Sequence, residues 1–430
     1  MQREELKEIA EILGNICSSS ISFHDANVQI QRMKLDPERI KLDISYIGAV
    51  LRNSVSLNMM IDSYFLRLNK NLRNVLLIAM VAVRFNKSPE EAKDIRSLLE
   101  EEFRRFELEN FFLSLKNLFS SVENDERLIP QGVKPNTVQY FSCLYNVPLD
   151  LFKMWVKQYG IRTAIRVASS FGRRAPLVYR TNTNKITSEE LLKTAPQGLK
   201  ATDVPEILSY TGKSPIRGTR EFKEGLLFKT QRVAYDLVDG IDFEGKDTLI
   251  YLADDSTIPF EVMLASQKKN GAAIDILTNS DAIKYPLMQK SNVIRNTKQY
   301  VRVSGFDGLE AYLHKKYPNV VYIPRSTKLD DVSARPELLL QLRLDSLDSL
   351  VFEQLEGLTA LSEFVEEYGY LYYIVPTLSK KETNRLIHSF VSENPTFSIV
   401  NERQCFPHEK GGATLYYAIL KKEPAKDGEN

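Results

Sequence analysis

The chain has 430 residues, with 57 Lys and Arg against 56 Asp and Glu and a formal net charge of +1. This length allows two or three domains with substantial cores, and the balanced charge excludes a general attraction to nucleic acid or acidic lipid. A surface that binds nucleic acid would therefore require local segregation of charge.

Targeting and redox signals are sparse. Residues 2–5 are polar, and the longest apolar run, residues 75–83, has nine residues. A bilayer span needs roughly 18 or more, so we expect no membrane segment and a cytoplasmic protein. The three cysteines, Cys17, Cys143 and Cys405, and the four histidines are widely dispersed. This spacing argues against a disulfide framework or a metal site and favours a reducing compartment.

The first part of the chain, to about residue 123, is almost free of Gly and Pro and repeats apolar residues at helical spacing. Leu6, Ile9 and Leu13 form one such stripe, which is typical of an amphipathic helix. Asp36 followed by Pro37 marks the start of another helix. We predict an all-helical domain over residues 1–125.

A polar connector with Pro130 and Gly132 follows and predicts a domain boundary. The next segment, residues 140–220, contains a short strand-like run that ends in Arg180-Thr181-Asn182. We predict a small α+β linker domain here. Considered alone, Arg180 fits a solvated side chain on an edge strand as well as it fits a functional side chain.

From residue 222 onward, strand-like and helical segments alternate, which predicts a doubly wound α/β domain over residues 221–424. Strands are expected at residues 249–252, 272–277, 300–303, 320–323, 370–375 and 414–420. Helices are expected at residues 229–238, 259–267, 344–368 and 381–392.

Residues 320–326, Val-Val-Tyr-Ile-Pro-Arg-Ser, read as a buried strand that ends in an active-site loop. The segment resembles the Asp-Ala-Pro-Cys-Ser motif of RNA cytosine-C5 methyltransferases of the RsmB/Sun (NOP/NSUN-like) family. Residues 35–62 are similar to the NusB-type RNA-binding fold, and residues 176–183 resemble the family's Pro-x-x-x-Arg-x-Asn-Thr strand. The resemblance implies a NusB-like helical domain, a small linker domain and a Rossmann-like class I methyltransferase domain.

The family's chemistry needs two cysteines and an aspartate. One thiolate adds to C6 of cytosine and makes C5 reactive, the second cysteine helps to release the product, and the aspartate stabilises the ring. Here Arg325 stands at the first cysteine position, Pro376 or Thr377 at the second, and Tyr322 at the aspartate position. A threonine hydroxyl without a neighbouring base is a poor replacement for a thiolate. The resemblance therefore implies no catalytic residue in this chain.

The resemblance also implies S-adenosylmethionine as cofactor, and the dispersed histidines and cysteines indicate no metal. The matching loop, residues 250–260, contains no glycine and carries Asp254 and Asp255, which argues against binding in the usual manner. Asp275 matches the carboxylate that binds the ribose, and Asp307 matches the residue near the adenine. The alternative for both is a helix cap or a turn former.

By the same resemblance, Arg180, Asn182 and Arg335 are expected to contact RNA. Cys405, three residues before His408, can be an activated thiol or a plain loop cysteine, and the loop cysteine is favoured.

The sequence leaves three candidate functions. The favoured one is an inactive methyltransferase-like protein that binds RNA, in particular ribosomal RNA, and works with ribosome-assembly proteins. The others are an active RNA methyltransferase with a rearranged site and a protein-interaction scaffold.

Overall fold

The computed structural model describes residues 3–32, 36–85, 89–104, 109–124, 128–172, 177–194, 197–212, 216–291, 299–303, 308–309, 315–330, 332–333, 335–342, 344–409 and 412–424. The chain divides into two compact units. Unit 1 comprises Met1–Arg174 and Asp331–Leu342, and unit 2 comprises Ala175–Asp330 and Arg343–Asn430. A short segment late in the sequence therefore belongs to the amino-terminal unit.

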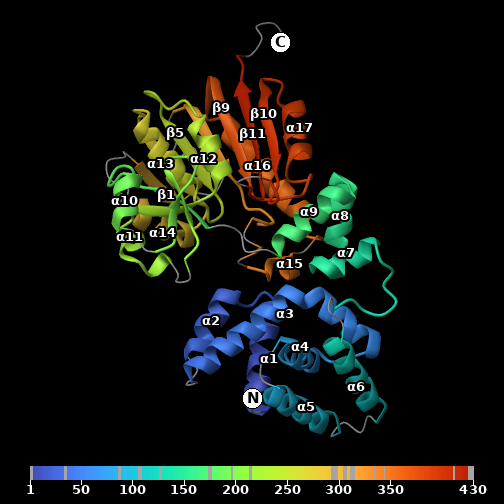
Figure 1. The fold of residues 1–430 in the computed structure, drawn as a ribbon. Helices are drawn as coiled ribbons and strands as arrows, with labels where there is room; N and C mark the ends of the chain where they lie inside the picture. The colour runs from blue at the N-terminus through green and yellow to red at the C-terminus, as the bar shows by residue number, and fades with distance from the viewer. Residues whose placement is uncertain are drawn as a thin grey trace. The chain divides into compact units, whose positions relative to one another are not determined.

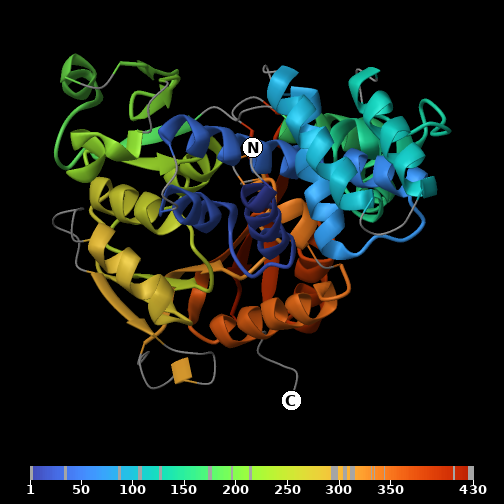
Figure 2. The same ribbon diagram turned by 90° about the horizontal axis from the view of Figure 1, so that it is seen from below.

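The described elements of unit 1 are helices (Figures 1 and 2). They are α1 (Arg3–Cys17), α2 (Phe23–Arg32), α3 (Pro37–Tyr64), α4 (Lys70–Phe85), α5 (Pro89–Arg104), α6 (Glu109–Asn124), α7 (Val138–Tyr145), α8 (Leu149–Tyr159), α9 (Ile161–Phe171) and α15 (Leu338–Gln341). The predicted start of α3 is confirmed, because Asp36 caps the helix by accepting a hydrogen bond from the amide of Arg39. In the described part of the chain, no helix combines the length and the apolar character that crossing a membrane requires.

The core of unit 1 explains the apolar stripes. Leu6, Ile9 and Leu13 of α1 are buried in one cluster with the apolar run of α4. Helix α7 is fastened to α3 by Asn146, whose side-chain oxygen accepts hydrogen bonds from the amide of Ser56 at 3.1 Å and from its hydroxyl at 3.0 Å. The helices α7 to α9 are therefore anchored on the main bundle.

Unit 2 begins with a four-stranded antiparallel sheet in the order β2-β3-β1-β4. Its elements are β1 (Leu177–Thr181), α10 (Ser188–Thr194), β2 (Leu199–Ala201), β3 (Ile207–Tyr210), the 3-10 helix η1 (Ile216–Gly218), α11 (Arg220–Lys223) and β4 (Leu227–Thr230). Because β1 lies between β3 and β4, it is an interior strand.

The larger sheet of unit 2 has seven strands in the order β10-β11-β9-β8-β5-β6-β7. The strands are β5 (Thr248–Leu252), β6 (Ile274–Thr278), β7 (Gln299–Val303), β8 (Tyr317–Ile323), β9 (Val365–Val375), β10 (Phe397–Cys405) and β11 (Leu415–Lys422). Strands β5 to β9 pair in parallel, and β11 is antiparallel to both of its neighbours. This arrangement confirms the predicted combination of a helical unit with a Rossmann-like α/β sheet.

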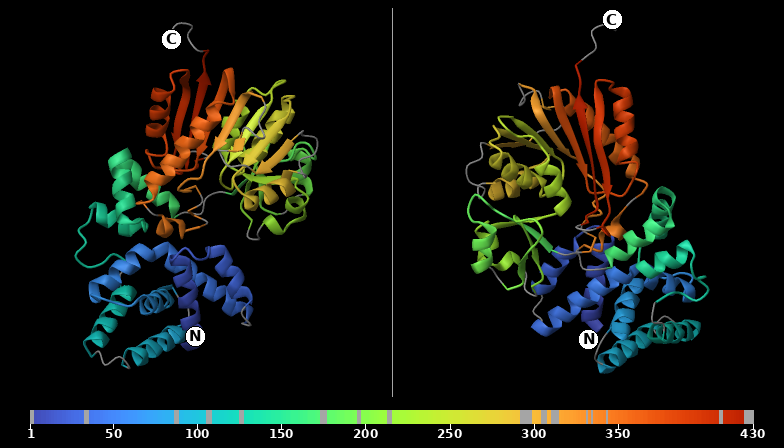
Figure 3. Two further views of the ribbon diagram at one scale, coloured as in Figure 1. Left: turned by 180° about the vertical axis from the view of Figure 1, so that it is seen from behind. Right: turned by 45° about the horizontal axis from the view of Figure 1, so that its top comes forward.

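Helices cover both faces of this sheet (Figures 1 and 3). Alternate residues of β5 show the division: Ile250 and Leu252 pack with α12 and α13, whereas Leu249 and Tyr251 pack with α16 and α17. A strand buried on both faces reads as a continuous apolar run, as the sequence of β5 does. The helices of this domain are α12 (Arg232–Asp239), α13 (Ile258–Lys268), α14 (Asp281–Ser291), α16 (Leu347–Ser362) and α17 (Asn384–Glu393).

Two predicted helices need correction, and one strand was not predicted. The helix expected at residues 229–238 starts too early, since Lys229 and Thr230 pair with β1 as the end of β4. The helix expected at residues 344–368 ends at Ser362, and Val365 begins β9. The sequence does not predict β10, because an edge strand with exposed polar side chains has no apolar alternation. The domain limits 1–125, 140–220 and 221–424 stay predictions.

Candidate functional site

Three loops of unit 2 follow the carboxyl ends of neighbouring parallel strands. Strands β5, β8 and β9 end at Leu252, Ile323 and Val375. The strand order reverses at β5, with β6 and β7 on one side and β8 and β9 on the other. Ligands of open α/β sheets bind beyond the strand ends at such a switch point. The loops after β5, β8 and β9 are therefore the candidate site.

The loop after β5 is joined directly to the loop after β8. The amide of Ala253 donates a hydrogen bond to the carbonyl oxygen of Ile323 at 2.9 Å. The carboxylate of Asp254 forms an ion pair with the ammonium of Lys328. These two side chains are 23% and 27% exposed, respectively, so the pair is partly shielded from water. Both contacts cross the switch point.

These residues do not fit the methionine end of S-adenosylmethionine. A loop that holds it needs glycine, because a Cβ atom blocks close approach of the cofactor to the backbone. Residues 253–257 read Ala-Asp-Asp-Ser-Thr. The carboxylates of Asp254 and Asp255 would repel the carboxylate of the cofactor, and Lys328 already pairs with Asp254.

The predicted ribose ligand, Asp275, is misplaced for that role. It is the second residue of β6 and is level with Leu249, the second residue of β5, so it does not end its strand. At about 3.3 Å for each residue, it lies roughly 10 Å from the carboxyl edge of the sheet. Its carboxylate accepts a hydrogen bond from the Tyr317 hydroxyl at 2.7 Å, so it is not a helix cap either. Asp307 lies outside the described residues.

The loop after β8 carries the predicted catalytic motif. Tyr322 is buried, with its ring centroid 6.0 Å from that of Tyr251 and 5.8 Å from that of Tyr373. Burial raises the pKa of its hydroxyl well above the ordinary value. The guanidinium of Arg325 donates a hydrogen bond to the carboxylate of Glu353 on α16 at 2.6 Å. Tyr322 therefore fills the core, and Arg325 is neutralised by a carboxylate.

A buried carboxylate that the sequence does not reveal joins the loops after β8 and β9. One oxygen of Glu382 accepts hydrogen bonds from the Thr327 amide at 3.1 Å and the Gln354 side chain at 3.2 Å. The other accepts from the hydroxyls of Thr327 at 2.9 Å and Thr377 at 2.6 Å. Burial raises the pKa of Glu382, and the hydrogen bonds oppose this rise. We call these four residues the Glu382 cluster.

The Glu382 cluster corrects one expectation about Thr377. A carboxylate does lie beside this hydroxyl, at 2.6 Å. The relative exposure of both residues is 0%, so a nucleic-acid base cannot reach either group. Pro376, the other candidate position, donates no proton from its side chain, and its carbonyl oxygen accepts the amide of Leu329 at 2.9 Å. Neither position supplies an accessible nucleophile.

Cys405 is not a loop cysteine. It is the last residue of β10 and is buried in the same apolar cluster as Leu415. Burial raises the pKa of its thiol to about 11. The interpretation as an activated thiol is therefore wrong, because a thiol with this pKa is protonated at neutral pH. Among the described residues, no group of His, Cys, Asp and Glu side chains could hold a metal ion.

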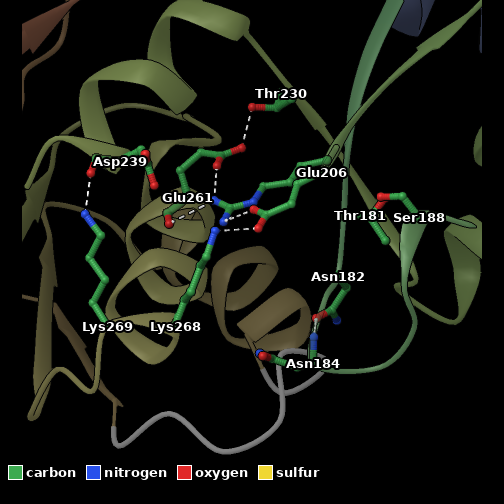
Figure 4. A network of polar contacts seen from close by, with 11 residues as sticks. Thr181, Asn182, Asn184, Ser188, Glu206, Thr230, Asp239, Glu261, Lys268 and Lys269 are labelled. Carbon is green, nitrogen blue, oxygen red and sulfur yellow. Dashed lines mark hydrogen bonds and ion pairs between the residues drawn. The ribbon is translucent and has the colours of Figure 1, made fainter. Parts of the chain in front are cut away.

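A second buried polar cluster links the small sheet to α13. The guanidinium of Arg180 pairs with the carboxylate of Glu261 and, at 3.1 Å, with that of Glu206. Glu206 also accepts a hydrogen bond from Lys268 at 2.7 Å, and the Thr230 hydroxyl donates to Glu261. Figure 4 shows Glu206, Glu261, Lys268 and Thr230 converging. Burial raises the pKa of Glu261, and the adjacent Arg180 opposes the rise.

The predicted RNA ligands are thus placed as follows. Arg180 is 2% exposed and Asn182 0%, so the interpretation of Arg180 as a solvated edge-strand residue is wrong. Asn182 donates to the carbonyl oxygen of Gly225 at 2.9 Å. Arg335 belongs to unit 1, where its Nε lies 3.3 Å from a carboxylate oxygen of Glu337. RNA contact by these three residues stays a prediction, and burial disfavours it for the first two.

No protein-family model and no curated protein matches this sequence. The crystal structure of PH0851 matches with a TM-score of 0.76 at 17% identity and covers 97% of this chain and 99% of that chain. A methyltransferase homologue from Pyrococcus horikoshii matches with a TM-score of 0.57 at 16% identity, over 67% of this chain and 100% of that chain.

A third structure, NSun6 from Pyrococcus horikoshii with SFG, matches with a TM-score of 0.56 at 12% identity, over 64% of this chain and 98% of that chain. At these identities the likeness is one of fold. The chain therefore has the Rossmann-like fold of methyltransferase type, in the arrangement of elements found in PH0851, in the methyltransferase homologue and in NSun6.

Proposed function

We propose that this protein binds RNA, with ribosomal RNA as the expected class, through a methyltransferase-type fold that no longer transfers a methyl group. The linked loops at the switch point carry the inactive part of the proposal. The ion pair between Asp254 and Lys328 ties the first two loops together, and the Glu382 cluster ties the second to the third. These are the loops that would hold a cofactor and a substrate in an open α/β fold.

The side chains of these loops also do not meet the chemical requirement for methylation of cytosine at C5. Methylation at C5 of cytosine needs a thiolate that adds to C6. The described loops after β5, β8 and β9 contain no cysteine. Cys405 at the end of β10 is buried, and its pKa of about 11 keeps it protonated. Loss of both the thiolates and the glycine loop supports an inactive protein.

The RNA part of the proposal rests on the resemblance of residues 35–62 and 320–326 to RNA-directed proteins, together with the methyltransferase-type fold. Ribosome-assembly proteins are the further partners that this function implies.

Calorimetric titration with S-adenosylmethionine tests the proposal, combined with transfer of tritium from the labelled cofactor to RNA. We expect no binding heat and no tritium in RNA, whereas RNA affinity falls steeply as salt is raised. Micromolar cofactor affinity would contradict the loss of the cofactor site, and transferred tritium would show an active methyltransferase with a rearranged site. Absence of RNA binding would favour a protein-interaction scaffold.

A further inference from the structure

Positive charge is concentrated in one segment of this nearly neutral chain. Residues 128–174 contain seven Lys and Arg against a single Asp, a net charge of +6. Since the whole chain carries +1, the remaining residues sum to −5. Because the net charge is close to zero, a surface that binds nucleic acid needs locally segregated positive charge, and this segment has it.

Four of these cations lie on the exposed faces of two successive helices. Lys153 and Lys157 are four residues apart on α8, and Arg162 and Arg166 are four residues apart on α9. All four are exposed. Residues with this spacing lie on one side of a helix, about 6 Å apart along its axis. We call these four residues the α8–α9 basic face.

The opposite faces of both helices are buried, so the orientation of the basic face is determined by packing. On α8 the buried residues include Phe152 and Trp155, and on α9 they include Ala164 and Val167. The two helices are joined at Gly160, whose φ of +80° lets the chain turn directly from one helix into the next.

Little negative charge opposes these cations. Lys153 lies 3.5 Å from Asp150, and both side chains are largely exposed. Among the described residues, no ion pair involves Lys157, Arg162 or Arg166. Asp150 pairs with Lys153 alone, so three of the four cations of the face have no ion pair among the described residues.

We infer that the α8–α9 basic face binds the phosphate backbone of RNA; this inference rests on the proposed function and assigns its surface. Both Arg and Lys are suited to phosphate groups, and Arg can bind them through two parallel hydrogen bonds. Lys is depleted in protein–protein interfaces, although Arg is enriched there, so it is the two lysines of the face that favour RNA over a protein partner. A membrane surface requires apolar residues beside the basic ones. Among the described residues of α8 and α9, Ile161 is the large apolar side chain that is exposed, at 38%. One such residue does not make an apolar face, so a membrane partner is also disfavoured.

The test replaces all four residues of the face (Lys153→Gln, Lys157→Gln, Arg162→Gln, Arg166→Gln) and measures affinity for a fluorescently labelled single-stranded RNA of random sequence over a range of salt concentrations. The matched control removes four exposed cations elsewhere (Lys193→Gln, Lys200→Gln, Arg217→Gln, Arg385→Gln). Circular dichroism checks that both variants fold. Each lost phosphate contact lowers the slope of log K against log salt by about 0.7.

We expect the slope to fall by about 2.8 in the four-residue variant, which corresponds to four contacts, and to change little in the control. Equal loss in both variants would overturn the inference while leaving RNA binding in place. If the wild-type protein binds no RNA, the proposed function itself fails. If the basic face bound polyglutamate with the same affinity as RNA, an acidic polypeptide would replace RNA as the inferred ligand.

Discussion

The carboxylate of Asp254 and the ammonium of Lys328 pair across the switch point of the large sheet, between the loops after β5 and β8. In open α/β folds this crevice receives the ligand. The backbone hydrogen bond from Ala253 to Ile323 links the same two loops. Glu382 links the loops after β8 and β9. Contacts within the protein thus link the three loops that follow these strand ends.

The strength of the Asp254–Lys328 pair can be measured by a double-mutant cycle with Asp254→Ala and Lys328→Ala. We expect a coupling energy of about 0.5–1 kcal/mol in urea unfolding, because both side chains are partly buried. The exposed pair Lys381 and Asp348 is the control, with a coupling near zero. A cycle that gives no more coupling for the first pair than for the control would show that the contact does not hold the loops together.

Glu382 should be important for stability. Glu382→Ala removes the acceptor for four buried donors, two on Thr327 and one each on Thr377 and Gln354. We expect a loss of about 3 kcal/mol in the free energy of unfolding, because buried polar groups are left without partners. The exposed Glu393→Ala on α17 should change stability by less than about 0.5 kcal/mol. Similar small effects for both variants would contradict the buried cluster.

The raised pKa of Glu382 predicts a dependence of stability on pH. Above the ordinary value of 4.5, the unfolded state loses this proton while the folded state keeps it. The folded state then binds more protons, so stability falls as pH rises, by at most about 1.4 kcal/mol for each pH unit. Urea unfolding of the wild type and Glu382→Gln should show the wild type losing stability relative to the variant as pH rises from 4.5. A difference that is constant or changes the other way contradicts this assignment.

Substitutions of Arg180 distinguish a structural role of this residue from contact with RNA. Arg180→Ala leaves the buried carboxylate of Glu261 without its cation and should cost about 3–5 kcal/mol. The double variant Arg180→Met, Glu261→Leu removes both charges and should recover most of this loss. Its RNA affinity should equal that of the wild type. A large drop in affinity in this folded double variant would instead support the predicted contact of Arg180 with RNA.

Cys405 should resist alkylation in the native protein. Its thiol is buried and has a pKa of about 11, whereas Cys17 is partly exposed. Iodoacetamide at neutral pH, followed by mass spectrometry, should label Cys17 first and Cys405 only after denaturation, because the thiolate is the reactive form. Labelling of Cys405 in the native protein at the rate of Cys17 would revive it as a candidate nucleophile.

Much of the fold is predictable because its signals are local. The strand at residues 249–252 and the helix at residues 259–267 match β5 and α13 to within one residue at each end. Apolar periodicity and buried apolar runs mark such elements without reference to distant residues. Edge strand β10 lacks these signals. Four successive residues of this strand, 401–404, are polar, and pairing with β11 identifies it as a strand.

The absence of a thiol at the two positions where the resemblance places cysteines is a matter of residue identity alone. Arg325, Pro376 and Thr377 cannot form a thiolate wherever the chain places them, and the loop at residues 253–257 lacks the glycine that eases close approach of backbone to a ligand. The segregation of positive charge in residues 128–174 is also a property of the sequence. Only the tertiary structure decided that Glu382 is a buried acceptor, that Asp275 lies away from the carboxyl edge and that Arg180 is paired inside the protein. The physical reason is that burial and pairing come from residues far apart in the chain, 55 positions for Glu382 with Thr327 and 81 for Arg180 with Glu261.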